Sequence, residues 1–335
     1  MLGLTMLTQI SGLTNRLLSP LSGLSATWFN GWHPVLDEAL QSLPEAETCP
    51  HELFRLLIQN PSPVRKLSVL VTKQGAPVAV AGLRQKGRYS WEPITQWILP
   101  GTVFPVKPDY LIPSLEAIGS EVWVAWWRME SSPPPSRMMR CLESTPTYRL
   151  HFSADYESYW RESGHWNTVR RCRKRCSDFT LVVNAPGSAE WTIANWEAHW
   201  RTDPTVVDPS VSDRIVAAKY LENQGRHYSF WLLDQQRPVA GHTFIRHHND
   251  LVWQVTYRDP SYDWHGAGTR LMDLAFSWAA LAGFQTIDMG GQHEYKIRWA
   301  PEEGERWWFS VCPEPLYSIK QAVNWARGLR GTGTN

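Results

Sequence analysis

The alternation of apolar and polar positions divides the first half of the chain into short strands and helices. Runs of β-branched residues bounded by Gly, Pro or Asn predict strands, whereas an apolar period of about 3.6 residues predicts helices. Gln74-Gly75 predicts a tight turn between two of the strands. The expected strands are 67–72, 77–83, 89–99 and 121–128, and the expected helices are 53–58 and 109–118.

The second half shows the same theme of helices, hairpin strands, a further helix and a closing strand. Both halves therefore predict an α/β layer, although no short sequence repeat is visible. The expected helices are 153–163, 167–176, 190–200, 212–223 and 269–282, and the expected strands are 179–184, 227–233, 238–247, 251–257 and 284–289.

A proline-rich segment separates the halves. Residues 131–136 contain three consecutive prolines, which favour an extended, semi-rigid linker. At the other end, residues 1–36 carry one charge, Arg16, and lack the features of a signal peptide. We therefore expect a leader at 1–30, a first domain at 31–135 and a second domain at 136–335. No run of 18 uncharged apolar residues occurs, so we expect no transmembrane segment.

Composition excludes several function classes. With 33 basic and 32 acidic residues the net charge is +1, so no global field draws the chain to nucleic acid or an anionic membrane. The five cysteines include no CxxC and predict reduced thiols in a cytoplasmic protein. The histidines show no HExxH spacing, and His247 and His248 would point to opposite faces of a strand, so we expect no metal.

The most informative segment is a strand, a glycine-containing loop and a helix between 251 and 282. Gly266 and Gly268 stand where the helix begins, so a ligand can approach the backbone and the free N–H groups of the first turn. Such a site suits a pyrophosphate, and the alternative is a loop whose glycines serve packing alone. The segment is neither a GxxxxGK phosphate loop nor a GxGxxG dinucleotide fingerprint.

These residues resemble the Q/R-x-x-G-x-G/A loop of the GNAT acyltransferases, with Asp263 at the Gln/Arg position. Downstream, Asp288-Met289-Gly290 and Tyr295-Lys296-Ile297-Arg298-Trp299 look like the D-x-G…Y-K-x-x-W ending of bacterial CelD-like proteins. The sequence is also similar to the Fem peptidoglycan aminoacyltransferases. The resemblance implies two tandem GNAT-like domains, each with a mixed, largely antiparallel sheet flanked by helices.

The resemblance also implies an activity, the transfer of an acyl group from acyl-CoA or an acyl-carrier protein to an amine. The acceptor class is a small molecule, a sugar or a peptide. The alternatives are a Fem-like transferase that uses aminoacyl-tRNA, which is less favoured because no long helical arm is visible, and a non-catalytic binding module. The residues implied to hold the donor are Val255, Thr256, Tyr257, His265, Gly266, Ala267, Gly268, Thr269 and Arg270.

Four residues are candidates for the chemistry. Asp288 ends a strand and would bind or deprotonate the amine, or cap the following glycines. His242 would act as a base, or be a satisfied strand histidine. Tyr295 would protonate the leaving thiolate, and Lys296 would bind a phosphate or carboxylate or stabilise the oxyanion. For both, the alternative is a structural role in the loop.

Two compositional features remain. Five cations lie within residues 170–175 and form either a solvated helix face or a dock for a phosphorylated donor. The 20 tryptophans are compatible with an acyl chain longer than acetyl. Most fall on expected strands and helices, where they would be core. We expect the substrate channel to be walled by Trp264, Trp299 and one of Trp307 or Trp308.

Overall fold

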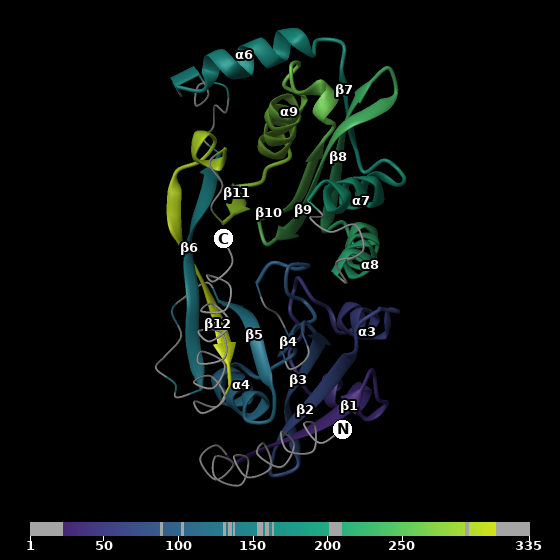
Figure 1. The fold of residues 1–335 in the computed structure, drawn as a ribbon, viewed down its shortest axis with the longest axis vertical. Helices are drawn as coiled ribbons and strands as arrows, with labels where there is room; N and C mark the ends of the chain where they lie inside the picture. The colour runs from purple at the N-terminus through teal and green to yellow at the C-terminus, as the bar shows by residue number, and fades with distance from the viewer. Residues whose placement is uncertain are drawn as a thin grey trace, which may run out of the picture.

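A computed structural model describes most of the chain. It covers residues 23–312 except 88–89, 102–103, 130–131, 133–135, 137, 153–156, 158–160, 163, 201–209 and 292–294. A single sheet of twelve strands runs through the described residues, with helices on both faces (Figure 1). The strand order is β1-β2-β3-β4-β5-β12-β6-β11-β10-β9-β8-β7.

The first half contains a strand, two helices, three antiparallel strands, one helix and a final strand. Its last two strands, β4 and β5, pair in parallel through Ser90 with Trp123 and Trp91 with Val124. The elements are β1 (Leu24–Asn30), α2 (Val35–Gln41), α3 (His51–Gln59), β2 (Lys66–Lys73), β3 (Ala76–Gln85), β4 (Ser90–Pro93), α4 (Leu111–Gly119) and β5 (Trp123–Met129).

The second half repeats this order, including a parallel pairing of its last two strands, β10 and β11. The repeat confirms the expected fold of two tandem GNAT-like domains with largely antiparallel sheets. The elements are β7 (Thr180–Val183), α7 (Ser188–Trp200), α8 (Ser210–Asn223), β8 (His227–Asp234), β9 (Arg237–His247), β10 (Asp250–Arg258), α9 (Ala267–Leu281) and β11 (Thr286–Gly290).

Two long strands join the repeats, because each pairs with the sheet of the repeat that it does not follow in the chain. β6 (Met139–His151) follows the first repeat in the chain but pairs with β11 of the second. β12 (Glu302–Val311) follows the second repeat but pairs with β5 of the first. The two also pair with each other, so one hydrogen-bonded sheet runs from end to end.

The sheet of the second repeat buries apolar side chains on both faces. On one face, Leu271 and Phe276 of α9 pack in one core with Phe230, Phe244 and Leu251. α6 (Trp166–Arg175) lies next to α9. On the other face lie α7 and α8, where Val255 joins a separate cluster with residues of both helices. Among the described residues, no helix has the length and apolar character needed to cross a membrane.

The structure differs from the sequence-based expectations in several places, one of which is α2, a helix that the apolar pattern did not predict. Residues 24–30, assigned to the leader, form β1 and pair with β2. The expected strand 89–99 ends at Pro93, and the turn that follows carries Trp97 at a positive φ of 66°. Neither β6 nor most of β12 was expected as a strand. The expected helix 153–163 lies largely outside the described residues, and the domain boundaries stay a prediction.

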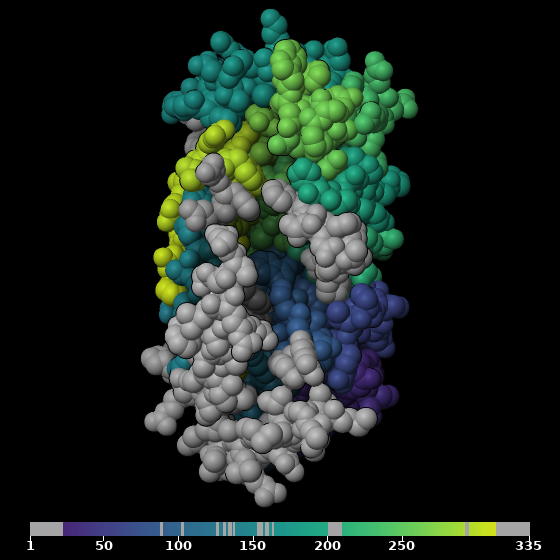
Figure 2. Space-filling view, in the orientation of Figure 1, coloured from purple at the N-terminus to yellow at the C-terminus, as the bar shows by residue number. Residues whose placement is uncertain are grey.

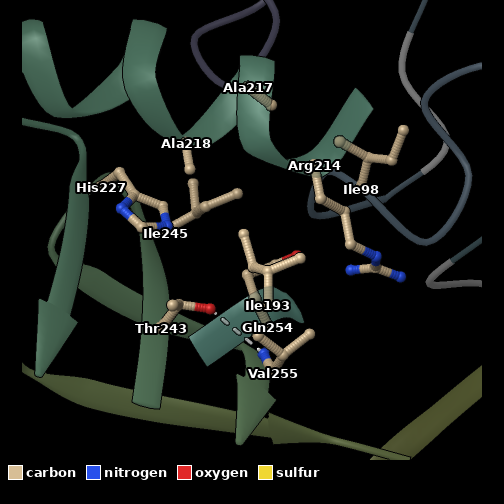
Figure 3. A pocket seen from close by; sticks show the side chains of 10 residues that line it. All are labelled: Ile98, Ile193, Arg214, Ala217, Ala218, His227, Thr243, Ile245, Gln254 and Val255. Atoms are coloured by element: carbon tan, nitrogen blue, oxygen red, sulfur yellow. Dashed lines mark hydrogen bonds between the residues drawn. The ribbon is translucent and has the colours of Figure 1, made fainter. Parts of the chain in front are cut away.

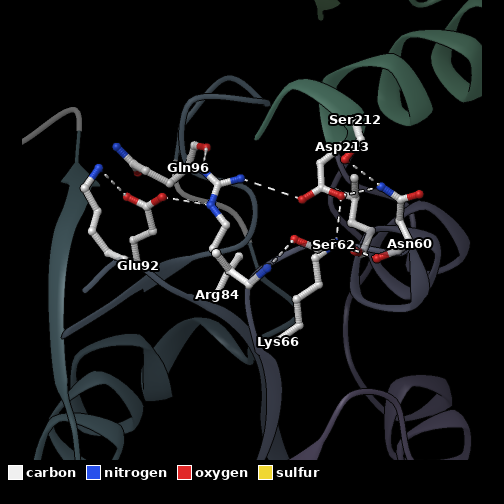
Figure 4. Close-up of polar contacts among 11 residues, drawn as sticks. Asn60, Ser62, Lys66, Arg84, Glu92, Gln96, Ser212 and Asp213 are labelled. Carbon is white, nitrogen blue, oxygen red and sulfur yellow. Dashed lines mark hydrogen bonds and ion pairs between the residues drawn. The ribbon is translucent and has the colours of Figure 1, made fainter. Parts of the chain in front are cut away.

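A buried polar network connects the two repeats (Figure 4). Asp213 of α8 accepts hydrogen bonds from Lys66 Nζ and Asn60 Nδ2, both at 2.7 Å, and its other oxygen lies 3.7 Å from Arg84 Nη1. Arg84 in turn binds Glu92 of β4 at 2.8 Å. The carboxylate from the second repeat therefore neutralises cations that β2 and β3 of the first repeat bury.

Candidate functional site

The parallel strands β10 and β11 separate part of the way along their length. They pair only between Asp250 and Val252 on β10 and between Thr286 and Asp288 on β11. A bulge at Gln254 follows, and from Val255 to Arg258 the strand pairs with β9 alone. The backbone edge of Thr256–Arg258 that faces β11 is therefore not paired with that strand. The family resemblance implies that a pantetheine arm binds at such an edge.

At the bulge, one backbone N–H of this segment bonds to a side chain. Val255 N–H donates to Thr243 Oγ1 at 3.3 Å. Gln254 and Val255 also line a small cavity with Arg214 of α8, His227 of β8 and Ile98 of the first repeat (Figure 3). The bulge therefore faces the junction of the repeats, where the space-filling view shows the surface hollowed (Figure 2).

The glycine loop forms the N-terminus of α9. Gly266 is its N-cap, with a left-handed φ of 74° that favours glycine. A Cβ at this position would lie 2.4 Å from Cys172 Sγ of α6, so close packing also requires glycine here. A Cβ on Gly268 would lie 3.0 Å from Cδ of Arg258, a flexible side chain. The structure thus supports the packing role at Gly266, whereas the role of the loop in binding a ligand stays a prediction.

The basic helix α6 docks beside this loop. Arg173 binds Asp273 of α9 through two bonds of 2.8 and 2.9 Å. Arg175 donates to the carbonyl of Trp264 at 2.8 Å, and its guanidinium lies 4.1 Å from the centre of the Trp264 ring. The remaining cations of the helix are exposed: Arg170, Arg171 and Lys174. Arg173 and Arg175 therefore anchor the helix to α9 and its preceding loop, while the other three cations are exposed.

Asp288 and Lys296 lie together at the end of β11. Asp288 is buried; its Oδ1 accepts from Gly290 N–H at 2.7 Å and its Oδ2 lies 2.5 Å from Arg306 Nη2. Lys296 is buried too and donates to the Gly291 carbonyl at 2.9 Å. Burial and the charge of Arg306 lower the pKa of Lys296 to about 8, although Asp288 opposes this shift. Asp288 thus both caps the glycine turn and pairs with an arginine.

The side chains of His242 and Tyr295 pack on the face of the sheet that α9 covers. The His242 ring is 4.4 Å from that of Trp253, and burial lowers its pKa to about 3. Tyr295 packs against the same core, and burial raises its pKa to about 12. Asp288 alternates with Ile287 and Met289, which face the α9 core, so its side chain leaves the opposite face. The four candidates therefore form two groups; their catalytic roles stay predictions.

Arg306 is the residue of this cluster that the sequence analysis missed. It precedes Trp307 and Trp308 on β12 and is buried. A lone arginine on a strand that continues into apolar residues was the available signal. Its partner Asp288 lies 18 positions away in the chain, a separation that no local spacing rule reports.

The tryptophans that were expected to line the substrate channel lie in different parts of the molecule. Trp264 is 68% exposed, whereas Trp299 is 2% exposed and packs against Phe276. Trp308 is buried and stacks on Trp97 of the first repeat at 4.7 Å, and Trp307 is half-buried. Trp264 therefore borders the glycine loop, and Trp308 lies at the contact between the repeats.

The corresponding position in the first repeat has no glycine loop. The segment before α4 reads Pro105-Val106-Lys107-Pro108, and Pro108–Tyr110 forms a single 3-10 turn. Apolar side chains fill this region, with the Phe104 ring 5.1 Å from that of Trp127. Of the two repeats, only the second combines separated strands with a helix that begins at a glycine, within the residues that the structure describes.

Comparisons with known proteins agree with this arrangement. Residues 163–297 match the acetyltransferase (GNAT) domain family. The fold is similar to that of FemX, with a TM-score of 0.51 and 12% identity over 88% of this chain and 99% of that one. It is also similar to L-PGS from Bacillus licheniformis, with a TM-score of 0.52 and 11% identity over 87% and 96%. A search of curated proteins found no match. Residues 163–297 thus match the GNAT domain family, and the chain as a whole has two GNAT-like folds in tandem.

Proposed function

We propose that the chain is an N-acyltransferase whose donor site lies in the second repeat, between β10 and β11. The observation that carries this proposal is the end of their parallel pairing at Val252 and Asp288. The segment beyond leads directly to the α9 N-terminus, where free N–H groups and the helix dipole favour a phosphate. An acyl-pantetheine arm fits this geometry because its amides can pair with a strand edge while its diphosphate reaches the helix.

The reaction is a direct transfer. The acceptor nitrogen bonds to the thioester carbonyl carbon, the carbon–sulfur bond breaks, and the thiolate takes up the proton that the nitrogen loses. Lys296 would stabilise the developing oxyanion, because its ammonium is held at the end of β11 by the Gly291 carbonyl. Asp288 and Arg306 would position that lysine, since Asp288 attracts its ammonium and is itself held by Arg306 at 2.5 Å.

His242 is a weak candidate for the general base. Its pKa of about 3 keeps the ring neutral at physiological pH but leaves it with little affinity for a proton. Tyr295, with a pKa of about 12, retains its proton and could deliver it to the leaving thiolate. We therefore favour Tyr295 over His242 for proton transfer.

The donor is proposed to be acyl-CoA or an acyl-carrier protein. Arg170, Arg171 and Lys174 are exposed on α6, the helix whose Cys172 packs against Gly266, so they can attract a donor that carries several phosphates. The exposed Trp264 ring, which contacts Arg175 of the same helix, offers a surface for a base or an acyl chain. Both features suit a large phosphorylated carrier rather than a small acyl donor.

A first experiment measures thiol release by the full-length chain from acetyl-CoA and from long-chain acyl-CoA, with amino sugars, lysine peptides and diamines as acceptors. Mass spectrometry identifies the amide product. Lys296→Met should lower kcat by about 10²–10³, the usual cost of losing an oxyanion donor. Lys219→Met is the matched control because Lys219 is an exposed lysine on α8. Equal turnover by the two variants would contradict the assigned site.

The exposed cations of α6 also favour a second candidate, an aminoacyl-tRNA-dependent transferase. The two donors are separated by treating the assay with RNase and by supplying charged tRNA in place of acyl-CoA. Activity that survives RNase and consumes acyl-CoA supports the first proposal. Activity that needs charged tRNA and is lost with RNase replaces it with the second.

A further inference from the structure

Two histidines converge at the turn between β9 and β10, at the end of β10 opposite the proposed donor site. His247 ends β9, and His248 follows in a left-handed conformation with φ of 54°. This backbone turn brings the two ring centres to 4.4 Å. The expectation that these side chains point to opposite faces of a strand is therefore wrong, because the strand ends at the first of them.

A carboxylate of the first repeat completes the group. Glu47 Oε2 lies 2.7 Å from His248 Nδ1, and the backbone N–H of His248 donates to both Glu47 oxygens at 3.2 and 3.3 Å. Arg226, next to β8, donates to the Glu47 backbone carbonyl. The glutamate is thus held in place from the second repeat, at both its side chain and its backbone.

The three side chains match the ligands of a transition-metal ion. One ligand atom from each of Glu47, His247 and His248 lies within 4.8 Å of the other two. Around a tetrahedral zinc ion with bonds of about 2.0–2.2 Å, the ligand atoms are about 3.4 Å apart. The His248–Glu47 pair, now at 2.7 Å, would open slightly to reach this spacing, a small change for an exposed histidine.

We propose that Glu47, His247 and His248 form a site for a divalent transition-metal ion of the zinc class that joins the two repeats. Imidazole nitrogen selects such ions over magnesium and calcium, which prefer oxygen ligands. Three protein ligands leave a fourth position open to water. The site does not depend on the proposed acyl transfer, because it lies at the end of β10 where pairing with β11 begins, away from the separated segment.

The test is a titration of the metal-free, full-length chain with Co²⁺ and Zn²⁺. We expect one ion per chain, and visible Co²⁺ bands of nitrogen and oxygen ligation without the sulfur charge-transfer band that the cysteines would produce. His247→Ala, His248→Ala and Glu47→Gln should each weaken binding at least about tenfold, because even outer contacts of metal sites contribute 10–100-fold. Zn²⁺ should also raise the Tm of the unaltered chain.

His151→Ala is the matched control, because His151 forms an exposed pair with Glu303 without a second histidine. It should bind the metal like the unaltered chain. The proposal is overturned if the chain binds no ion, if the three variants bind as tightly as the control, or if the cobalt spectrum shows sulfur ligation. Circular dichroism of each variant separates lost binding from lost folding; if one variant fails to fold, the other two decide.

Discussion

Lys66 Nζ and Asp213 Oδ1 lie 2.7 Å apart across the junction of the two repeats, with side chains 5% and 0% exposed. Lys66 comes from β2 and Asp213 from α8, so the pair fixes a helix of one repeat against the sheet of the other. Burial lowers the pKa of Lys66, and Asp213 opposes this shift. The pair therefore makes the packing of the repeats dependent on one carboxylate.

Asp213→Ala should destabilise the fold by about 3–5 kcal/mol, because it leaves Lys66 and Arg84 buried without their shared carboxylate. Urea unfolding followed by circular dichroism measures this change. Glu190→Ala, which breaks the pair between the half-buried Glu190 and the exposed Lys219, is the control and should cost less than about 1 kcal/mol. Similar costs for the two variants would show that the junction does not rely on Asp213.

Activity should fall as the pH rises through about 8. Lys296 loses its proton there, and the proposed role requires the ammonium form. A profile of kcat/KM between pH 6 and 10 measures this limb, and Lys296→Arg should move it to higher pH because arginine stays charged. Activity that rises through pH 8 would instead assign the neutral amine as a base.

The same shift predicts a change in stability. In the unfolded chain the lysine keeps its proton up to about pH 10.5, whereas the folded chain releases it at about 8. The unfolded state therefore binds more protons between these values, and the contribution of Lys296 raises the free energy of unfolding with pH across that window. Lys296→Met should remove this contribution, as the difference between urea titrations of the two chains at pH 7.5 and 9.5 would show.

How much the sequence predicts depends on whether the signal is local. Most elements of the second repeat and the glycine loop follow from periodicity and turn residues close in the chain, whereas β1 and α2 of the first repeat were not expected. β6 was missed because its middle is polar and carries Pro146, and its pairing with β12 joins residues more than 150 positions apart. The convergence of His247 and His248 depends on a left-handed backbone at a non-glycine residue, which spacing does not report.

The two glycines of the α9 loop should respond differently to substitution. Gly266→Ala should cost about 2–4 kcal/mol, because it combines a left-handed alanine with a contact of 2.4 Å to Cys172 Sγ. Gly268→Ala should leave stability nearly unchanged, since the flexible Arg258 side chain has to shift its Cδ by only a few tenths of an ångström. Urea unfolding of both variants measures the difference.

The double variant Cys172→Ala/Gly266→Ala tests how much of the cost at Gly266 comes from packing against α6. Removing the sulfur relieves the contact but not the backbone strain, so the double variant should recover part of the lost stability. Strictly additive costs would mean that packing against α6 is not what requires glycine. For function, Gly268→Leu should raise the KM for the donor if the loop holds its diphosphate.

The tryptophans at the proposed channel should separate into structural and functional ones. Trp299→Ala should cost about 3–5 kcal/mol, because the ring is buried against Phe276. Trp264→Ala should cost about 1 kcal/mol or less, because the ring is exposed and its contact is a surface cation–π pair with Arg175. If Trp264 borders the bound donor, its loss raises KM while the urea midpoint stays the same. An unchanged KM for both short and long acyl donors would remove Trp264 from the substrate channel and leave it a surface contact of α6.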